Sequence, residues 1–311
     1  MKVLFIAGWD RSGSTLLDLV LGSIDGFTGV GELGNVWKRG IIERRTCGCG
    51  QPLSRCEVWS PILTSVFGHF PTPEEARRIL RFRRDHTRLR HTWRILRAGD
   101  HDGLDPYLAL LSRLYRAIGA WTGARVVVDS SKDASDAAAL IRTPDVEVSV
   151  VHLVRDPRAS AYSVRHRPKV QTDTEKASTM RRQGVVHGTL NWLAWNGAAE
   201  LVARRIPERS LVMRYEDLVA EPVAAVRSIV ELVGEGGAEL PFVTERTALV
   251  RPVHTVSGNP TRFASGPIDI RLDDEWSREQ PPVDRWMATT IAGPLMPRYG
   301  YPLSVGRAAA R

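Results

Sequence analysis

The sequence KVLFIAGWDRSGST at residues 2–15 places an apolar run directly before a loop rich in glycine and hydroxyl side chains. Residues 2–7 are too few for a helix and almost entirely apolar, so they predict a buried strand. A helical pattern follows over residues 13–22. A loop between a strand and a helix directs backbone N–H groups and the positive end of a helix dipole toward one point. The segment therefore predicts a phosphate-binding loop.

The side chains of this loop also suit an anion. Gly13 lets the backbone approach a ligand closely, while Ser12, Ser14 and Thr15 supply hydroxyl groups. Arg11 adds a fixed positive charge. The spacing resembles a Walker A loop, but Ser14 stands where that motif has its lysine. Because that lysine normally reaches the β and γ phosphates, a loop without it suits a donor with one 5′-phosphate and one transferable group.

Apolar, β-rich runs recur along the chain and alternate with helical patterns. Strands are expected at residues 2–7, 125–129, 147–154 and 210–215, and helices at 13–22, 134–142, 157–167, 186–205 and 223–233. The alternation predicts an α/β fold, a P-loop NTPase-like doubly wound parallel sheet flanked by helices. Ligands of such sheets bind beyond the carboxyl ends of the strands, where residues 8–15, 130–132 and 155–158 lie.

The chain is expected to form a single domain over residues 1–303, followed by a frayed tail at 304–311. A long, mostly helical insertion is expected at residues 26–123, after the first strand and helix. Nine arginines lie between residues 77 and 97 of this insertion. A solvated, salt-bridged helix is the first interpretation of this run, and contact with a substrate or a lipid surface is the alternative.

The net charge of +8 favours anionic partners, a class that includes nucleic acid, membrane surfaces and phosphorylated small molecules. No apolar run approaches the roughly 20 residues that a membrane-spanning helix needs. The apolar residues 3–9 have only Lys2 before them and lead straight into Asp10 and Arg11, which is a poor pattern for a signal peptide. We therefore expect a cytoplasmic protein.

A second phosphate site is expected after the strand at residues 147–154. Pro157 fits the first turn of a helix, which places Arg155 at the end of the strand and Ser163 two turns further on. An arginine and a hydroxyl in these positions can hold one phosphate together. The alternative is a plain helix start at Arg155-Asp156-Pro157 with a local ion pair.

Taken together, the two segments resemble the donor-binding segments of sulfotransferases that use 3′-phosphoadenosine-5′-phosphosulfate (PAPS). The resemblance implies that the first loop holds the 5′-phosphosulfate and that Arg155 and Ser163 hold the 3′-phosphate. It implies a second clamp on that phosphate at Gly258 and Arg262. The similarity also takes in residues 31–33, 129–132, 214–218 and 254–263, and it is greatest to the bacterial and carbohydrate-type branch. Residues 214–218 are expected to close a strand and begin a helix outside the site.

The resemblance further implies sulfuryl transfer in line to a hydroxyl or amine of a small-molecule, sugar or lipid acceptor, beside which the insertion would lie. Glu32 is the first candidate for the general base, and Arg11 would stabilise the leaving phosphate. Lys132 is the second candidate. It either stabilises charge on the transferred group or pairs with Asp129 or Asp133, and it acts as a base only if burial lowers its pKa by several units. No metal is expected in this scheme.

Three cysteines, Cys47, Cys49 and Cys56, lie within ten residues and are too few and too local for a disulfide scaffold. A zinc site lacks a clear fourth ligand because the nearest histidine is His69. Structural or redox-labile thiols are therefore expected, and a disulfide from Cys56 to one of the others is the alternative.

Two other functions stay open. The Walker-like spacing suggests a nucleotide-dependent kinase or ATPase, which the missing lysine argues against. A non-enzymatic, basic RNA-binding or membrane-surface protein would use the arginine-rich insertion and would show no preference for a nucleotide donor.

Overall fold

The computed structural model describes residues 1–97, 103–166, 170–171, 178–179 and 183–304. The last residue of the helix expected at 157–167 and the expected tail from residue 305 onward lie outside the described residues. No helix within the described part of the chain is both long and apolar enough to cross a membrane.

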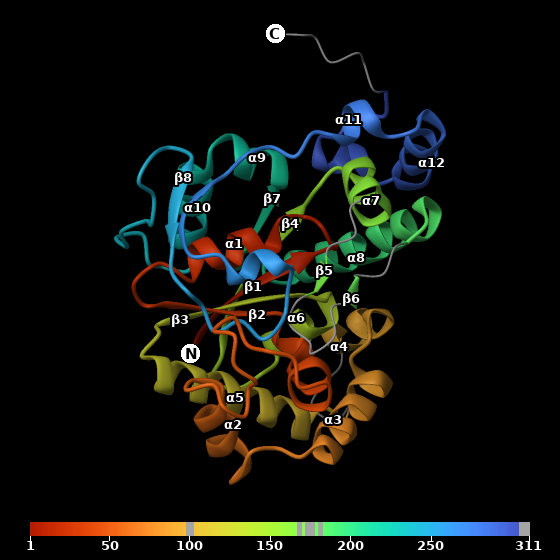
Figure 1. Cartoon of the computed structure of the whole chain (residues 1–311). Helices are drawn as coiled ribbons and strands as arrows, with labels where there is room; N and C mark the ends of the chain where they lie inside the picture. The colour runs from red at the N-terminus through yellow and green to blue at the C-terminus, as the bar shows by residue number, and fades with distance from the viewer. Residues whose placement is uncertain (98–102, 167–169, 172–177, 180–182, 305–311) are drawn as a thin grey trace.

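A five-stranded parallel sheet forms the centre of the fold (Figure 1). Its strands are β1 (Lys2–Gly8), β2 (Phe27–Gly31), β3 (Val126–Lys132), β4 (Glu147–Val154) and β7 (Ser210–Arg214). Their order across the sheet is β2-β3-β1-β4-β7, and every neighbouring pair is parallel. β1 is the central strand, with β3 beside it on one edge and β4 on the other. The loop after β1 therefore lies at the topological switch point of the sheet, where the strand order reverses. The predicted doubly wound parallel sheet is confirmed.

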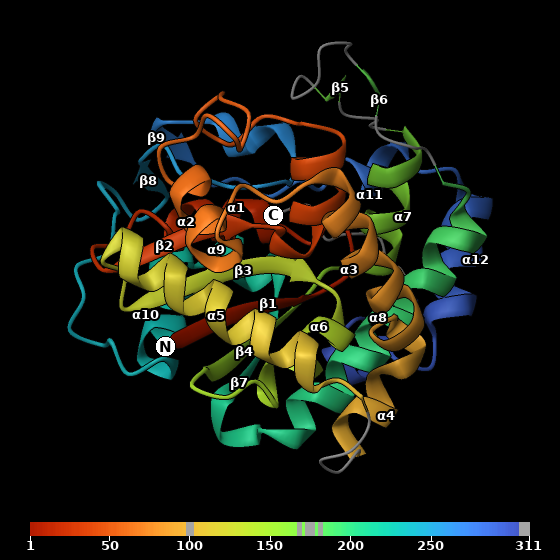
Figure 2. The same cartoon turned by 90° about the horizontal axis from the view of Figure 1, so that it is seen from below.

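Helices cover both faces of the sheet because the side chains of the central strand alternate between two apolar cores. Val3 and Phe5 face one core, whereas Leu4 and Ile6 face the other, and all four are fully buried. The second core packs against α1 (Ser14–Leu21), α9 (Tyr215–Ala220) and α10 (Pro222–Leu232). The first packs against α2 (Trp59–Phe67), α5 (Asp105–Thr122), α6 (Ala134–Ile141) and α8 (Val185–Arg205). Figure 2 shows α5 lying across β3 and β1 on this side.

The remaining elements surround these layers. The α-helices and strands among them are α3 (Pro73–His86), α4 (Thr92–Arg97), α7 (Pro157–His166), α11 (Trp276–Glu279), α12 (Pro282–Ala292) and two antiparallel pairs, β5 (Val170–Gln171) with β6 (Ser178–Thr179) and β8 (Thr247–Val250) with β9 (Gly266–Asp269). Short 3-10 helices and a π-helix over Val36–Ile42 connect them. In Figure 1, α7, α11 and α12 gather at one end of the sheet, and the orange insertion helices lie beneath it.

The sequence analysis missed strand β2, which falls inside the expected insertion. Its sequence, FTGVG, is short and contains two glycines, so it carries little intrinsic preference for a strand. The strand is stabilised by pairing with β3, in which Phe27, Thr28 and Gly29 align with Val126–Val128. The helical part of the insertion therefore begins after Gly31, and Glu32 stands at the carboxyl end of a sheet strand.

One arginine of the basic run, Arg83, joins the insertion to helix α6, which covers one face of the sheet. One guanidinium nitrogen of Arg83 on α3, Nη2, contacts both carboxylate oxygens of Asp136 on α6, at 2.7 and 2.6 Å. The exposed Arg84 pairs only with its neighbour Asp85. The salt-bridged interpretation of this helix therefore holds for both residues, and at Arg83 the ion pair joins two layers of the fold.

Candidate active site

The loop after β1 takes the conformation that an anion-binding strand-to-helix loop requires. α1 begins at Ser14, and Gly13 caps its N-terminus with a φ of 90°. A Cβ atom on Gly13 would lie 2.7 Å from a ring carbon of Tyr215. Glycine is needed here for two reasons, since the backbone is left-handed and the tyrosine ring occupies the space.

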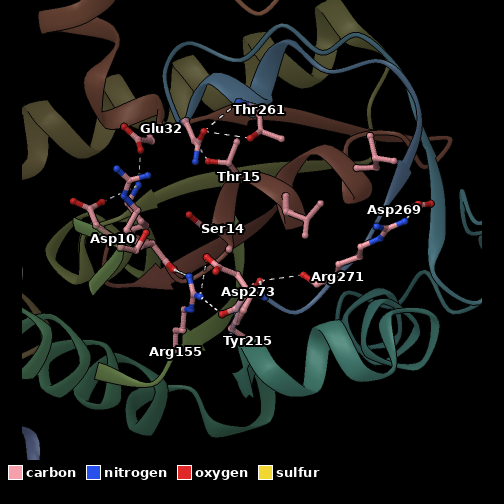
Figure 3. A pocket seen from close by; sticks show the side chains of 17 residues that line it. Asp10, Ser14, Thr15, Glu32, Arg155, Tyr215, Thr261, Asp269, Arg271 and Asp273 are labelled. Carbon is pink, nitrogen blue, oxygen red and sulfur yellow. Dashed lines mark hydrogen bonds and ion pairs between the residues drawn. The ribbon is translucent and has the colours of Figure 1, made fainter. Parts of the chain in front are cut away.

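The loop opens into a pocket of about 360 Å³ at the carboxyl end of the sheet (Figure 3). The predicted site residues that line it are Arg11, Gly13, Ser14, Thr15, Glu32, Lys132, Arg155 and Ser163. They come from separate stretches of sequence between residues 11 and 163. The parallel sheet brings them together because β1, β2, β3 and β4 all end at the same edge.

Two of the predicted donor-binding side chains, those of Ser12 and Arg262, contact backbone carbonyls in the structure. Ser12 is buried, and its hydroxyl donates to the carbonyl of Trp9 at 2.7 Å, so this side chain turns into the fold. Arg262 is 1% exposed, and its guanidinium donates to the carbonyls of Thr255 and Thr46, each at 2.7 Å. Arg262 therefore joins two backbone segments where a phosphate clamp was expected.

The loop around Gly258 nevertheless lies where the second clamp was expected. A Cβ atom on Gly258 would lie 3.4 Å from the hydroxyl oxygen of Thr15. The backbone N–H of Asn259 donates to the same hydroxyl at 3.3 Å. Asn259 and Thr261 line the pocket, and Figure 3 shows Thr261 beside Thr15. The expected segment is present, but its polar side chains occupy the wall where an arginine was predicted.

Arg155 occupies the end of β4 and is held on three sides. Its guanidinium donates to the carbonyl of Arg11 at 3.0 Å and to that of Asp273 at 2.7 Å. It also pairs with the Asp273 carboxylate at 3.2 Å and lies 4.4 Å from the centre of the Tyr215 ring. The helix start and the local ion pair of the alternative interpretation are both present, but the pair is formed by Asp156 and Arg158, which leaves Arg155 facing the pocket. Arg155 is thus directly hydrogen-bonded to the loop after β1.

Glu32 lies at the opposite wall in a dense polar cluster. One carboxylate oxygen accepts a short hydrogen bond from Lys132. The other accepts from Asn35 at 2.7 Å, Ser257 at 3.2 Å and Arg39 at 3.3 Å. The side chains of Glu32 and Lys132 are 13% and 12% exposed. These contacts hold the Glu32 carboxylate in one orientation at the edge of the pocket.

The charges of this cluster fix its protonation states. Burial disfavours the ionised carboxylate of Glu32, but Lys132 and Arg39 outweigh burial and lower its pKa to about 2. Burial also opposes the charge on Lys132, yet Glu32 and Asp10 outweigh it and raise its pKa. Because the shift is opposite to the one a lysine base requires, Lys132 acts as a cation at neutral pH. The Lys132 ammonium pairs with Glu32 and lies 3.5 Å from the carboxylate of Asp10. The expected partners were Asp129 or Asp133.

Two of the four basic side chains that line the pocket, Arg11 and Lys132, sit on strained backbone. Arg11 has a φ of 68° and Lys132 a φ of 70°, both in the left-handed region that side chains other than glycine rarely adopt. At Lys132 the cause is an irregular end to β3, where the pairing with β1 shifts between Phe5 and Ala7. Such irregularities redirect side chains beside binding sites, and strain persists where the surrounding structure enforces it.

Sequence reasoning missed much of the outer wall of the pocket. Tyr215 was placed outside the site, yet its ring packs against Gly13 and lies under Arg155. The expected strand end and helix start are confirmed, since β7 ends at Arg214 and α9 begins at Tyr215. Residues 268–273 add Asp269, Arg271 and Asp273 to the lining. No local motif marks this segment, and only its packing against the loop brings it to the pocket.

Gly13→Ala is expected to weaken ligand binding at the loop and to lower the free energy of unfolding by about 1–3 kcal/mol, since it adds both strain and a clash with Tyr215. Gly123→Ala is the matched control, because Gly123 has a φ of 68° and open space around it. Denaturant unfolding of both variants separates the two effects. Equal losses of stability would show that the Tyr215 contact contributes nothing.

A histidine that the sequence analysis did not connect with the cysteine segment lies beside it in the fold. His254, almost 200 residues further along the chain, lies beside Cys47 and Cys56. His69 instead faces Glu75 at 3.1 Å. All three cysteines are free thiols, so the alternative of a disulfide is not found.

Comparison with known proteins identifies a family whose model covers most of the residues that line the pocket. The model of a sulfotransferase family matches residues 4–236, which include the loop, Glu32, Lys132, Arg155 and Ser163. The chain belongs to the sulfotransferase family. No curated protein sequence matches this sulfotransferase.

Two solved structures resemble the sulfotransferase in fold. The sulfotransferase domain of the Synechococcus PCC 7002 olefin synthase is 18% identical, with a TM-score of 0.51 over 95% of this chain and 94% of that domain. The sulfotransferase domain from the curacin biosynthetic pathway is also 18% identical, with a TM-score of 0.53 over 97% of this chain and 99% of that domain. Both support the parallel-sheet architecture.

Proposed function

We propose that this sulfotransferase moves a sulfuryl group from PAPS to a hydroxyl or amine of a small-molecule, sugar or lipid acceptor. The observation that carries the proposal is the meeting of the loop, Arg155, Ser163, Glu32 and Lys132 in one pocket. The first three suit a donor that carries two separate phosphate groups. The last two provide a carboxylate and a cation at the opposite wall.

The donor is proposed to lie along the loop with its 5′-phosphosulfate at the N-terminus of α1. There the helix dipole, Ser14 and Thr15 favour negative charge. The 3′-phosphate would lie between Arg155 on β4 and Ser163 on α7, which both line the pocket. Arg155 pairs with the Asp273 carboxylate, and we expect the 3′-phosphate to displace that carboxylate.

The reaction forms a bond between the acceptor oxygen or nitrogen and sulfur as the bond from sulfur to the bridging phosphate oxygen breaks. The bridging oxygen leaves with adenosine 3′,5′-bisphosphate, and the acceptor proton passes to Glu32. Arg11 and Lys132 would stabilise the charge that develops on the leaving phosphate and the transferred group. By analogy with phosphoryl transfer, positioning and electrostatic stabilisation supply most of the rate.

The ion pair with Lys132 gives Glu32 its low pKa, so a role as the base requires this pairing to change when the donor binds. While Lys132 neutralises it, Glu32 holds a proton poorly. We propose that the phosphosulfate draws the Lys132 ammonium toward itself, so that burial dominates at Glu32 and its affinity for a proton rises. The base would then be activated only when the donor is bound.

Lys132→Met is expected to move the acidic limb of the pH profile of kcat/KM to higher pH. Glu32 stays ionised down to pH values near its pKa of about 2 while Lys132 is present. Without the Lys132 charge, less electrostatic attraction offsets the effect of burial, so the pKa of Glu32 rises. As the pH falls, the active ionised form is then lost at a higher pH than in the wild type. Lys132→Arg keeps the charge and should keep the limb in place. An unshifted limb in Lys132→Met would disprove the coupling.

The proposed reaction is tested by a screen with donor labelled in the sulfuryl group against alcohols, phenols, sugars, amines and lipids. Transfer of label to an acceptor class supports the proposal and identifies that class. Release of label to water alone, with every class of acceptor present, argues against it. Arg155→Ala serves as the background control.

A further inference from the structure

Cys47, Cys49, Cys56 and His254 form a cluster outside the donor pocket. Each offers one ligand atom, and these atoms all lie within 4.8 Å of one another. Cys47 and Cys56 are 0% and 1% exposed. Three cysteines and one histidine are a donor set that structural zinc sites use.

Four of the six distances between the ligand atoms match the edges of a tetrahedron around zinc, and all six are within 4.8 Å. The sulfur of Cys56 lies 3.7 Å from those of Cys47 and Cys49. The Nδ1 atom of His254 lies 3.3 Å from the sulfur of Cys56 and 3.7 Å from that of Cys47. Zinc bonds of about 2.3 Å to sulfur and about 2.0–2.1 Å to nitrogen give tetrahedral edges of about 3.8 Å and about 3.5 Å. A disulfide needs about 2.05 Å between sulfurs, which is far shorter.

The surroundings orient the ligand atoms. The backbone N–H of Trp59 points at the sulfur of Cys56 at 3.4 Å, and its indole N–H donates to the carbonyl of His254 at 2.6 Å. The far nitrogen of the His254 ring, Nε2, lies 3.8 Å from the carboxylate of Glu57. A carboxylate facing the second nitrogen is the usual arrangement for a metal-binding histidine, because it fixes the ring and its tautomer.

We propose that these four residues bind a structural Zn²⁺ ion. With four protein ligands the site is closed and leaves no position for a substrate. Binding displaces the protons of the three thiols to solvent, while His254 binds through its neutral ring. Three thiolates and one Zn²⁺ leave a net charge of −1 at the site.

The ion would fasten the loop at residues 46–56 to the segment at 253–263. The two segments already share a hydrogen bond of 2.9 Å from the N–H of Gly48 to the carbonyl of Thr255. A Cβ atom on Gly48 would lie 2.1 Å from the carbonyl oxygen of Val253, so the contact needs glycine. Three residues after His254, Ser257 donates to the carboxylate of Glu32. The zinc would thus position one wall of the active site without taking part in the reaction.

The test is the metal content of the full chain, expressed with zinc in the medium and purified under reducing conditions without chelator. About one zinc per chain is expected from elemental analysis. His254→Ala is expected to retain less than about a tenth of an equivalent after dialysis, because a lost ligand opens the site. His69→Ala, which changes the histidine nearest in sequence, should keep the full equivalent.

Cobalt supplies a measurement that does not depend on a variant folding. Wild-type protein reconstituted with Co²⁺ should show the intense visible bands of a tetrahedral site and thiolate-to-cobalt charge transfer. Wild-type protein that folds with less than about a tenth of an equivalent of zinc, or a spectrum without these features, would overturn the proposal. Neither result depends on PAPS binding, so the metal site and the proposed reaction can fail independently.

Discussion

Glu32→Gln is expected to lower kcat by about 10²- to 10⁴-fold, the usual contribution of a general base. The amide keeps the shape of the carboxylate and can still accept a hydrogen bond from Asn35, but it cannot take the acceptor proton. Affinity for adenosine 3′,5′-bisphosphate should change little, since Glu32 lies at the wall opposite Arg155. Single-turnover rates and calorimetric titration measure the two quantities separately.

Glu43→Gln is the matched control for this variant. Glu43 belongs to the same segment, and its carboxylate pairs with Arg45 at 2.7 Å. We expect wild-type turnover from it. Wild-type turnover in Glu32→Gln as well would remove Glu32 from the proton transfer. A loss of bisphosphate affinity equal to that of Arg155→Ala would make Glu32 a structural residue of the donor site.

Arg155→Ala is expected to weaken binding of adenosine 3′,5′-bisphosphate by about 30- to 1,000-fold, or about 2–4 kcal/mol. Its guanidinium is 6% exposed, and a buried, charge-assisted contact with phosphate is strong. The substitution also removes the hydrogen bond to the carbonyl of Arg11, so part of the loss would come from the loop itself.

Two companion variants separate these contributions. Arg155→Lys keeps the charge without the planar fork and should bind with intermediate affinity. Asp273→Asn removes the carboxylate that competes with the phosphate for Arg155, so its affinity should equal or exceed that of the wild type. Unfolding measurements with each variant show whether the fold is retained. Unchanged bisphosphate affinity in a folded Arg155→Ala protein would contradict the proposed 3′-phosphate site.

The sheet and the loop could be predicted because their signals are local. The apolar run of β1 and the glycine that follows are encoded within about a dozen adjacent residues, and a parallel sheet then forces the ends of its strands together. Strand β2 escaped prediction because its two glycines weaken the pattern and its pairing with β3 is non-local. The same limit hid Tyr215, whose role depends on packing against Gly13.

Arg262 and His254 show a second limit. An arginine in a loop rich in glycine and polar residues has the same sequence pattern whether it faces a phosphate or two backbone carbonyls. Only the fold shows that the Arg262 guanidinium donates to the carbonyls of Thr46 and Thr255. In the same way, three cysteines seemed to lack a ligand because the histidine that completes the cluster comes from a distant segment.

The central claim, that the pocket holds a 3′-phosphorylated donor, is tested most directly by ligand-dependent thermal unfolding of the wild-type protein. Adenosine 3′,5′-bisphosphate without added divalent metal should stabilise it, by about 2.7 kcal/mol at a concentration 100 times its Kd. ATP with Mg²⁺ at the same concentration should give a much smaller effect. Stabilisation by ATP with Mg²⁺ and none by the bisphosphate would contradict the account and favour a kinase or ATPase. Retention on heparin or anionic lipid with no effect of either nucleotide would favour a binding protein.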